Sequence, residues 1–188
     1  IMRLVCLLIL CLSLLARPAT AEENIVNIYN WSSYISSDVL KQFTQETGIK
    51  VNYTTYDSNE TLYAKLKANP HTGYDVIVPS TYFVDRMRQQ GMLQALDKSR
   101  LPNFKNLNPA LLNKPYDPDN HYSIPYFWTS TGVVVNSKLH SVQQLQAWAD
   151  FWKPRYRNQL LLLDDVHEVF SMALMVLGYS ANDTHPEH

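Results

Sequence analysis

Apolar and polar positions alternate along the chain in a way that predicts strands followed by helices. Short apolar runs predict strands at residues 25–28, 49–53 and 74–78, and apolar residues at helical spacing predict helices from Ser37 to Gly48, from Ser58 to Pro70 and through Val84 to Gly91. The third strand is continuously apolar, which is typical of a strand buried in a parallel sheet. This order of elements predicts an α/β fold with helices on both faces of the sheet.

The second half of the sequence is less regular. Residues 97–120 carry four prolines and many asparagines, which predicts an irregular surface excursion. Residues 124–128 and 132–136 then predict two strands, where a crossover between two lobes is expected. A helical turn at residues 145–152, a strand at 160–163 and a helix that stops at Gly178 follow.

Hydroxyl and aromatic side chains follow two of the predicted strands. Trp31, Ser32 and Tyr34 come directly after the first strand, and Ser80 and Tyr82 come after the third. In open α/β sheets ligands bind at the carboxyl ends of the strands, so these side chains are expected to open on one sheet edge. The alternative is that the aromatic rings simply close the top of a hydrophobic core, as aromatic residues near strand ends commonly do.

Two acidic residues follow the last predicted strand. Asp165 and Glu168 are three positions apart at the start of a helix, which matches a capping box and suits the helix dipole. The same two carboxylates at a strand end are also suited to pairing with a cationic ligand. The spacing alone leaves both interpretations open.

The first 21 residues have the features of a secretory signal. Arg3 precedes an apolar run at residues 4–15, and Ala19 and Ala21 are the small residues expected before cleavage at Glu22. The run is too short to span a membrane, and a lipoprotein signal would need a small residue before Cys11, where Leu10 stands. We therefore expect export to the periplasm, with no membrane-spanning segment after cleavage.

Composition narrows the possible functions. The 188 residues are 46% hydrophobic with a net charge of −1, and no basic stripe supports binding to nucleic acid. Both cysteines lie in the predicted signal, and without it 14 basic residues face 17 acidic ones, which favours a cationic ligand over an anionic one. The histidines show no metal-ligand spacing, so no metal and no cofactor are expected.

Several motifs together closely resemble the periplasmic spermidine/putrescine-binding proteins of polyamine ABC transporters. The motifs are Tyr-Asn-Trp-Ser-x-Tyr at 29–34, Ser-Asn-Glu-Thr at 58–61 with Tyr-Ala-Lys-Leu at 63–66, residues 75–82, Asn-Lys-Pro at 113–115, Ser-Ile-Pro-Tyr at 123–126 and Asp-Asp-x-x-Glu-Val-Phe at 164–170. They occur in the family's order over about residues 24–182.

The resemblance implies a type II periplasmic binding protein-like fold, in which a polyamine lies in a cleft between two α/β lobes. It implies a protein that captures putrescine or spermidine in the periplasm and delivers it to an inner-membrane ABC permease, without catalysis or a cofactor. Carried over by motif, the ligand-binding residues would be Trp31, Ser32, Tyr34, Ser80 and Tyr82 from the first lobe and Asp165 and Glu168 from the second.

Two features depart from the family. Family members commonly have an acidic residue where this chain has Ser33, which leaves the preference between putrescine and spermidine open. The family also continues for nearly as long again, so the chain is expected to be a truncated or split form. We expect a signal peptide at residues 1–21, a first lobe at 22–130 that lacks its returning segment, and a partial second lobe at 131–188.

Two other classes of function are compatible with parts of this sequence. The same scaffold would suit a polyamine-sensing subunit for a membrane receptor, or a binding protein for another cationic solute. A secreted serine hydrolase would need Ser80 or Ser32 as its nucleophile. Neither serine lies in a Gly-x-Ser-x-Gly elbow, and no histidine is identifiable as its base.

Overall fold

Three parallel strands form the sheet of this protein. The computed structural model describes residues 24–69 and 71–188, so the predicted signal peptide lies outside the described residues. The strands are β1 (Ile25–Trp31), β2 (Lys50–Tyr56) and β3 (Val76–Ile77), in the order β2-β1-β3. β1 pairs with β2 along its whole length and with β3 at Ile28 and Tyr29. The predicted parallel sheet is confirmed.

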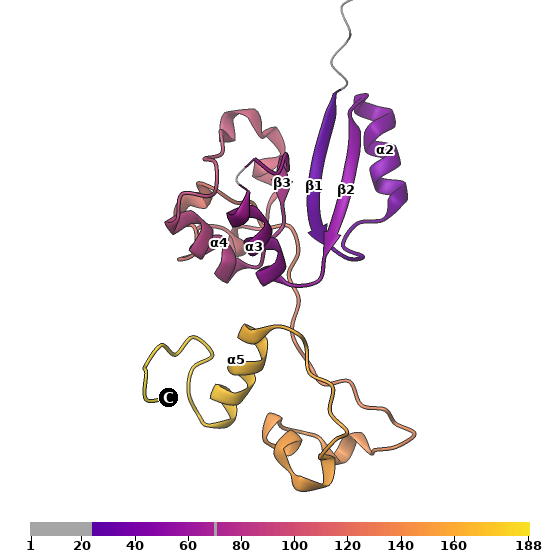
Figure 1. Ribbon diagram of the computed structural model, residues 1–188, viewed down its shortest axis with the longest axis vertical. Coiled ribbons are helices and arrows are strands. Elements are labelled where there is room, and N and C mark those ends of the chain that lie inside the picture. Colours follow the sequence, from indigo (N-terminus) through magenta and orange to yellow (C-terminus); the bar gives the residue numbers. More distant parts are fainter. Residues whose placement is uncertain (1–23, 70) are drawn as a thin grey trace, which may run out of the picture.

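Helices connect the strands and cover both faces of the sheet. They are α2 (Ser37–Thr47), α3 (Asn59–Ala68) and α4 (Thr81–Gln89). Because β2 and β3 lie on opposite sides of β1, right-handed connections carry α2 and α3 past opposite faces. Figure 1 shows α2 beside β2, with α3 and α4 together on the other side of the sheet. The predicted fold class is confirmed.

Serine side chains begin the first two helices. The Ser36 hydroxyl accepts a hydrogen bond from the Val39 amide at 3.3 Å, and the Ser58 hydroxyl accepts one from the Thr61 amide at 3.2 Å. The helix predicted from Ser37 is confirmed, and the residue before it, Ser36, has the extended backbone that an N-cap needs. Gly48 ends α2 at a φ of 70°, which favours glycine.

The core lies between the sheet and the α3 and α4 helices. Its buried members are Tyr29, Tyr56, Leu62, Tyr63, Phe83 and Met87. The Tyr29 ring stacks on Tyr74 at 4.5 Å and meets Tyr56 edge-on at 4.9 Å. Helix α2 has no buried residue, so the face that carries α3 and α4 supplies most of the packing.

The third strand differs from its prediction. A buried strand was expected over residues 74–78, but β3 has two residues, and Val76 is 46% exposed. Within the described residues β3 pairs only with β1, so it is an edge strand with one side open. The apolar run predicted the strand correctly and its burial wrongly.

The excursion after α4 is irregular, as predicted. It contains the short 3-10 helices η1 (Lys98–Arg100), η2 (Pro102–Asn106), η3 (Pro109–Leu111) and η4 (Pro118–Asn120). The fully buried Asp117 carboxylate accepts hydrogen bonds from the backbone amides of residues 121–123 and from the Ser123 hydroxyl. Arg88 of α4 donates to the Tyr116 carbonyl at 3.0 Å, which ties the excursion to the sheet layer.

Three predicted strands do not form. Residues 124–128, 132–136 and 160–163 have no regular secondary structure, and Val134 and Leu161 are 98% and 96% exposed. A strand needs a neighbouring strand for its backbone hydrogen bonds, and no described segment pairs with these residues. The apolar pattern was therefore insufficient to predict sheet structure here.

The C-terminal portion, residues 137–188, is built from short turns and one longer helix. Its elements are η5 (Val142–Gln144), η6 (Trp148–Trp152), η7 (Pro154–Tyr156) and α5 (Val166–Val176). They confirm the predicted helical turn and the helix that ends before Gly178. Figure 1 shows α5 below the sheet layer, after the extended segment that returns from the short turns toward the sheet.

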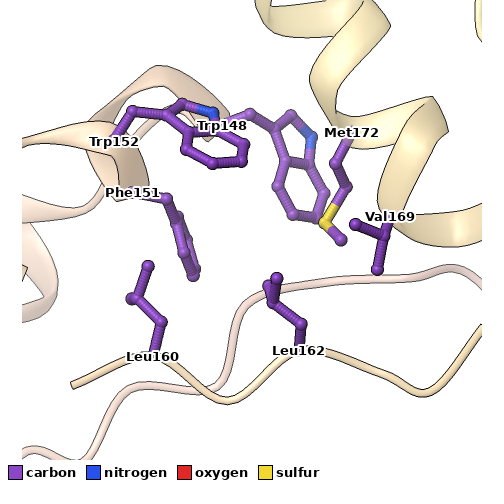
Figure 2. A pocket seen from close by; sticks show the side chains of 7 residues that line it. All are labelled: Trp148, Phe151, Trp152, Leu160, Leu162, Val169 and Met172. Atoms are coloured by element: carbon purple, nitrogen blue, oxygen red, sulfur yellow. The ribbon is translucent and has the colours of Figure 1, made fainter. Parts of the chain in front are cut away.

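A small apolar cluster holds the C-terminal portion together. Figure 2 shows aromatic side chains of η6 facing leucines of the extended segment and two residues of α5. These side chains, Trp148, Phe151, Trp152, Leu160, Leu162, Val169 and Met172, line a cavity of about 20 Å³. This volume holds about one water molecule, so the cavity is a gap in packing that is too small for an organic ligand. Within residues 24–69 and 71–188, no helix is both long and apolar enough to cross a membrane.

Candidate ligand-binding site

The parallel register brings the ends of β1 and β3 to the same edge of the sheet. Ile28 pairs with Val76 and Tyr29 with Ile77, so the chain beyond Trp31 and the chain leading to Ser80 emerge together. The predicted convergence of these two loops is confirmed. The side chains at this edge form two groups, one mainly aromatic and one mainly polar.

The aromatic group is centred on Trp31 and Tyr34. Their ring centroids are 6.1 Å apart, and Trp31 also lies 4.7 Å from the ring of Tyr56. Tyr34 lies 5.0 Å from Phe127, and its carbonyl accepts a 2.6 Å hydrogen bond from the Tyr126 hydroxyl. Trp31 and Tyr34 are both half-buried, so they pack on neighbours while part of each ring stays open to a ligand.

Tyr56 packs against Trp31 and supports the aromatic group. Its hydroxyl donates to the Val78 carbonyl, two residues before Ser80, and its side chain is buried. Burial raises the pKa of Tyr56 well above its ordinary value, and the hydroxyls of Tyr34 and Tyr29 add to the shift. The phenol therefore stays neutral and acts as a fixed wall beneath Trp31.

Ser32 is exposed in the loop after β1. Its hydroxyl donates to the Asp57 carboxylate at 3.2 Å, so a carboxylate stands beside the loop although position 33 is a serine. Asp57 was not among the site residues predicted from the sequence. Its position immediately after β2 was the available signal, since that is also a strand end.

The polar group is organised by Asn59, a fully buried residue at the start of α3. Its amide nitrogen donates to the Ser80 hydroxyl at 3.0 Å and to the Tyr82 hydroxyl at 2.8 Å. Its amide oxygen accepts from the Ser80 backbone amide at 3.0 Å. The sequence predicted Asn59 as part of a helix start and of a family motif, but gave no sign that it bonds two of the predicted site residues.

Tyr82 carries the polar group across to the C-terminal portion. Its hydroxyl donates to the Asp165 carboxylate at 2.6 Å. The ring of His167 stacks on the Tyr82 ring with centroids 4.2 Å apart and planes 8° from parallel. Burial raises the pKa of Tyr82, and the hydrogen bond to Asp165 and its negative charge raise it further, so the hydroxyl keeps its proton.

Asp165 caps α5, as one of its two interpretations predicted, and it also bonds a residue of the sheet edge. One carboxylate oxygen accepts from the Glu168 amide at 3.0 Å and caps α5, while the other accepts from Tyr82. The Glu168 carboxylate accepts a 2.7 Å hydrogen bond from the Thr131 hydroxyl. Both acids are half-buried and each has acceptor positions beyond these bonds, which suits a ligand that carries only donors.

The structure thus joins Ser80, Tyr82 and Asp165 in one hydrogen-bonded network and places Trp31 and Tyr34 in the neighbouring aromatic group. Glu168 is one helical turn from Asp165, and Ser32 lies at the exposed rim. In the described part of the chain, no group of three or more histidine, cysteine or acidic residues is arranged to hold a metal ion. The contacts of these residues with a ligand remain predictions.

Comparison with known proteins adds to this geometry. The sequence matches the family described as bacterial extracellular solute-binding protein over residues 38–188. It is 54% identical over 167 residues to the spermidine/putrescine-binding periplasmic protein of Salmonella typhimurium, covering 89% of this chain and 48% of that protein. It is 43% identical over 176 residues to the putrescine-binding periplasmic protein of Escherichia coli K12, covering 87% and 47%.

A solved structure shows the same relationship. The spermidine/putrescine ABC transporter substrate-binding protein of Streptococcus pneumoniae matches with a TM-score of 0.70 at 41% identity, covering 87% of this chain and 50% of that one. The α/β fold is therefore that of the type II periplasmic binding proteins. The chain belongs to the bacterial extracellular solute-binding protein family. It spans about half the length of the curated relatives it matches.

Proposed function

We propose that this chain binds a polyamine, putrescine or spermidine, at the edge of the sheet where the aromatic and polar groups meet. The observation that carries the proposal is the hydrogen bond from Tyr82 to Asp165, because it brings a carboxylate of α5 to the strand-end residues of the sheet. The names of the relatives, which are spermidine- or putrescine-binding proteins, support the same ligand class.

The chemistry of the site suits a polyamine. The ligand is a flexible chain of methylenes with ammonium groups, so flat aromatic walls such as Trp31 and Tyr34 can hold the methylenes and attract the cations. Each cation–π contact contributes about 0.5–2 kcal/mol. The carboxylates of Asp165 and Glu168 then accept charge-assisted hydrogen bonds from an ammonium group. Asp57, beside Ser32, is placed to serve a further ammonium group in the absence of an acid at position 33.

We also propose that the protein acts by binding alone. The Ser80 hydroxyl accepts from Asn59 and the Ser32 hydroxyl donates to Asp57, and neither partner is the histidine base of a serine hydrolase triad. The relatives are named as a periplasmic protein and as an ABC transporter substrate-binding protein, which supports location in the periplasm and delivery to an inner-membrane ABC permease. Export by a signal peptide at residues 1–21 is proposed from the charged and apolar pattern of those residues.

Calorimetric titration of the chain from residue 22 onward tests the proposal. Putrescine and spermidine should bind, and butane-1,4-diol, which keeps the methylenes and lacks the charges, should not. Affinity for putrescine should fall with added salt, because charge pairs at a partly open site are screened. Equal binding of the diol and the diamine would exclude a cation site.

A further inference from the structure

Asn59 is oriented without ambiguity by its partners. The Ser80 backbone amide can only donate a hydrogen bond, so the group of Asn59 that faces it at 3.0 Å must be the carbonyl oxygen. The amide nitrogen therefore faces the hydroxyls of Ser80 and Tyr82, and its two hydrogens match these two acceptors. The residue is fully buried, so water does not offer alternative partners.

This orientation sets the direction of the next hydrogen bond. A phenol has one proton, and the Tyr82 oxygen already accepts from Asn59 at 2.8 Å. Its proton is free to go to Asp165, at 2.6 Å. The hydrogen bonds therefore run in one direction, from Asn59 to Tyr82 and from Tyr82 to Asp165. The second bond joins residues that are 83 positions apart in the sequence.

The helix itself does not explain why an asparagine occupies position 59. Ser58 is the residue that caps α3, through its bond to the Thr61 amide. All three side-chain bonds of Asn59 instead go to residues of the loop before α4 and of α4 itself. A fully buried amide is costly unless every polar atom is bonded, so its role lies in what it orders.

We propose that Asn59 is a positioning residue of the polyamine site, which commits the Tyr82 hydroxyl to donate to Asp165. The carboxylate of α5 is thereby held at the sheet edge, with its remaining acceptor positions available to an ammonium group. Asn59 acts through Tyr82 and does not touch the ligand. This inference rests on the proposed function, since the site it serves is the polyamine site.

The substitution Asn59→Asp tests the direction of the bonds at nearly constant shape. The introduced carboxylate can still accept a hydrogen bond from the Ser80 amide. It cannot donate to the Tyr82 hydroxyl as the asparagine does, and can only accept from it. The Tyr82 proton is then drawn to position 59, and Asp165 loses its donor. We expect putrescine affinity at pH 8 to fall at least tenfold. The matched control is Asn52→Asp, the same change at an exposed residue of β2 that bonds Asn27, where affinity should stay within twofold.

A double-mutant cycle separates this role from general scaffolding. In a Tyr82→Phe background the hydroxyl is absent, so Asn59→Asp should cause no further loss of affinity. A tenfold loss in both backgrounds would overturn the proposal. At a pH near 5 the putrescine affinity of the Asn59→Asp variant should move closer to that of the unmutated chain. The reason is that a protonated carboxyl at position 59 can again donate to the Tyr82 hydroxyl.

An NMR measurement without ligand tests the positioning role of Asn59 independently of polyamine binding. The Tyr82 ring, stacked 4.2 Å from His167, should shift the His167 ring protons upfield in an NMR spectrum. The shift should be lost in Asn59→Asp and kept in Asn52→Asp.

If the chain does not bind putrescine but the shift behaves in this way, the proposed function fails and the positioning role of Asn59 stands. If Asn59→Asp does not fold, Asn59→Leu removes the donor without a charge at nearly constant size and should give the same loss. An unchanged shift in a folded variant would overturn the role.

Discussion

The hydroxyl of Tyr82 donates a 2.6 Å hydrogen bond to Asp165, and this bond joins the sheet layer to the helix α5. The ring of His167 packs on the same tyrosine, so α5 meets the sheet edge through both a polar and an aromatic contact. Tyr82 and Asp165, both predicted to bind the ligand, are thus in direct contact although 83 positions separate them in the sequence. This contact sets the first prediction.

Replacing Asp165 separates its charge from its capping role. Asparagine is as good an N-cap as aspartate, so Asp165→Asn should keep α5. Its single amide oxygen cannot accept from both Glu168 and Tyr82, so the lost bond should cost about 1 kcal/mol of stability. Putrescine affinity should fall about tenfold and lose most of its salt dependence, because the charge is gone. The control Asp165→Ala should in addition cost about 1 kcal/mol of stability. Full affinity in Asp165→Asn would limit the residue to capping.

Trp31 should contribute an open aromatic wall. Trp31→Ala is expected to weaken putrescine binding by about 1 kcal/mol or more, since it removes a stacking surface and a cation–π partner. Trp31→Phe keeps a ring and should lose less than the alanine variant. Calorimetry gives the dissociation constants and circular dichroism checks folding. An unchanged dissociation constant in folded Trp31→Ala would show that this side chain serves only the packing with Tyr56.

The Tyr82 hydroxyl should also matter for stability. Tyr82→Phe leaves a buried donor of Asn59 and an acceptor of Asp165 without their partner, and an unsatisfied buried group costs about 1–3 kcal/mol. Urea unfolding measures the loss. Tyr74→Phe is a suitable control, because its hydroxyl bonds only the exposed Lys65 among the described contacts, and it should cost about 0.5 kcal/mol or less. Equal losses in both variants would contradict the network.

Stability should fall at alkaline pH. Burial raises the pKa of Tyr56 in the folded state, so above about pH 10 the unfolded chain releases the proton first and unfolding becomes easier as pH rises. One such group contributes a slope of up to about 1.4 kcal/mol per pH unit. Tyr56→Phe should reduce the slope of the unfolding free energy between pH 10 and 11.5. Met87→Leu, a core change without an ionisable group, should leave it unaltered.

The chain alone is expected to be a weak binder. Large apolar side chains such as Trp152, Leu161 and Phe170 are exposed, which predicts association in solution. A ligand in an open site is partly solvated, so its charge contacts are weaker. We expect putrescine to bind at least tenfold more weakly, about 1.4 kcal/mol, than to the Salmonella typhimurium relative of which the chain spans 48%. A monomer with equal affinity would contradict this prediction.

Local pattern was sufficient for the elements around the sheet. The caps at Ser36 and Ser58, the stop at Gly48 and the apolar periodicity of residues 25–91 all act over a few positions, so the elements and their parallel order could be predicted to within about three residues. The position of the site at the strand ends followed from that order. The exceptions are residues 124–128, 132–136 and 160–163, whose apolar runs predicted strands that require a partner the pattern does not specify.

The sequence by itself determined the α/β order, the position of Trp31 at the end of β1 and of Tyr82 soon after β3, and the acids that begin α5. Only the tertiary structure decided that Asn59 meets Tyr82 and that Tyr82 meets Asp165, because these hydrogen bonds join groups 23 and 83 positions apart. Such bonds depend on how the chain packs, since a buried amide or carboxylate is stable only where its particular partners converge on it.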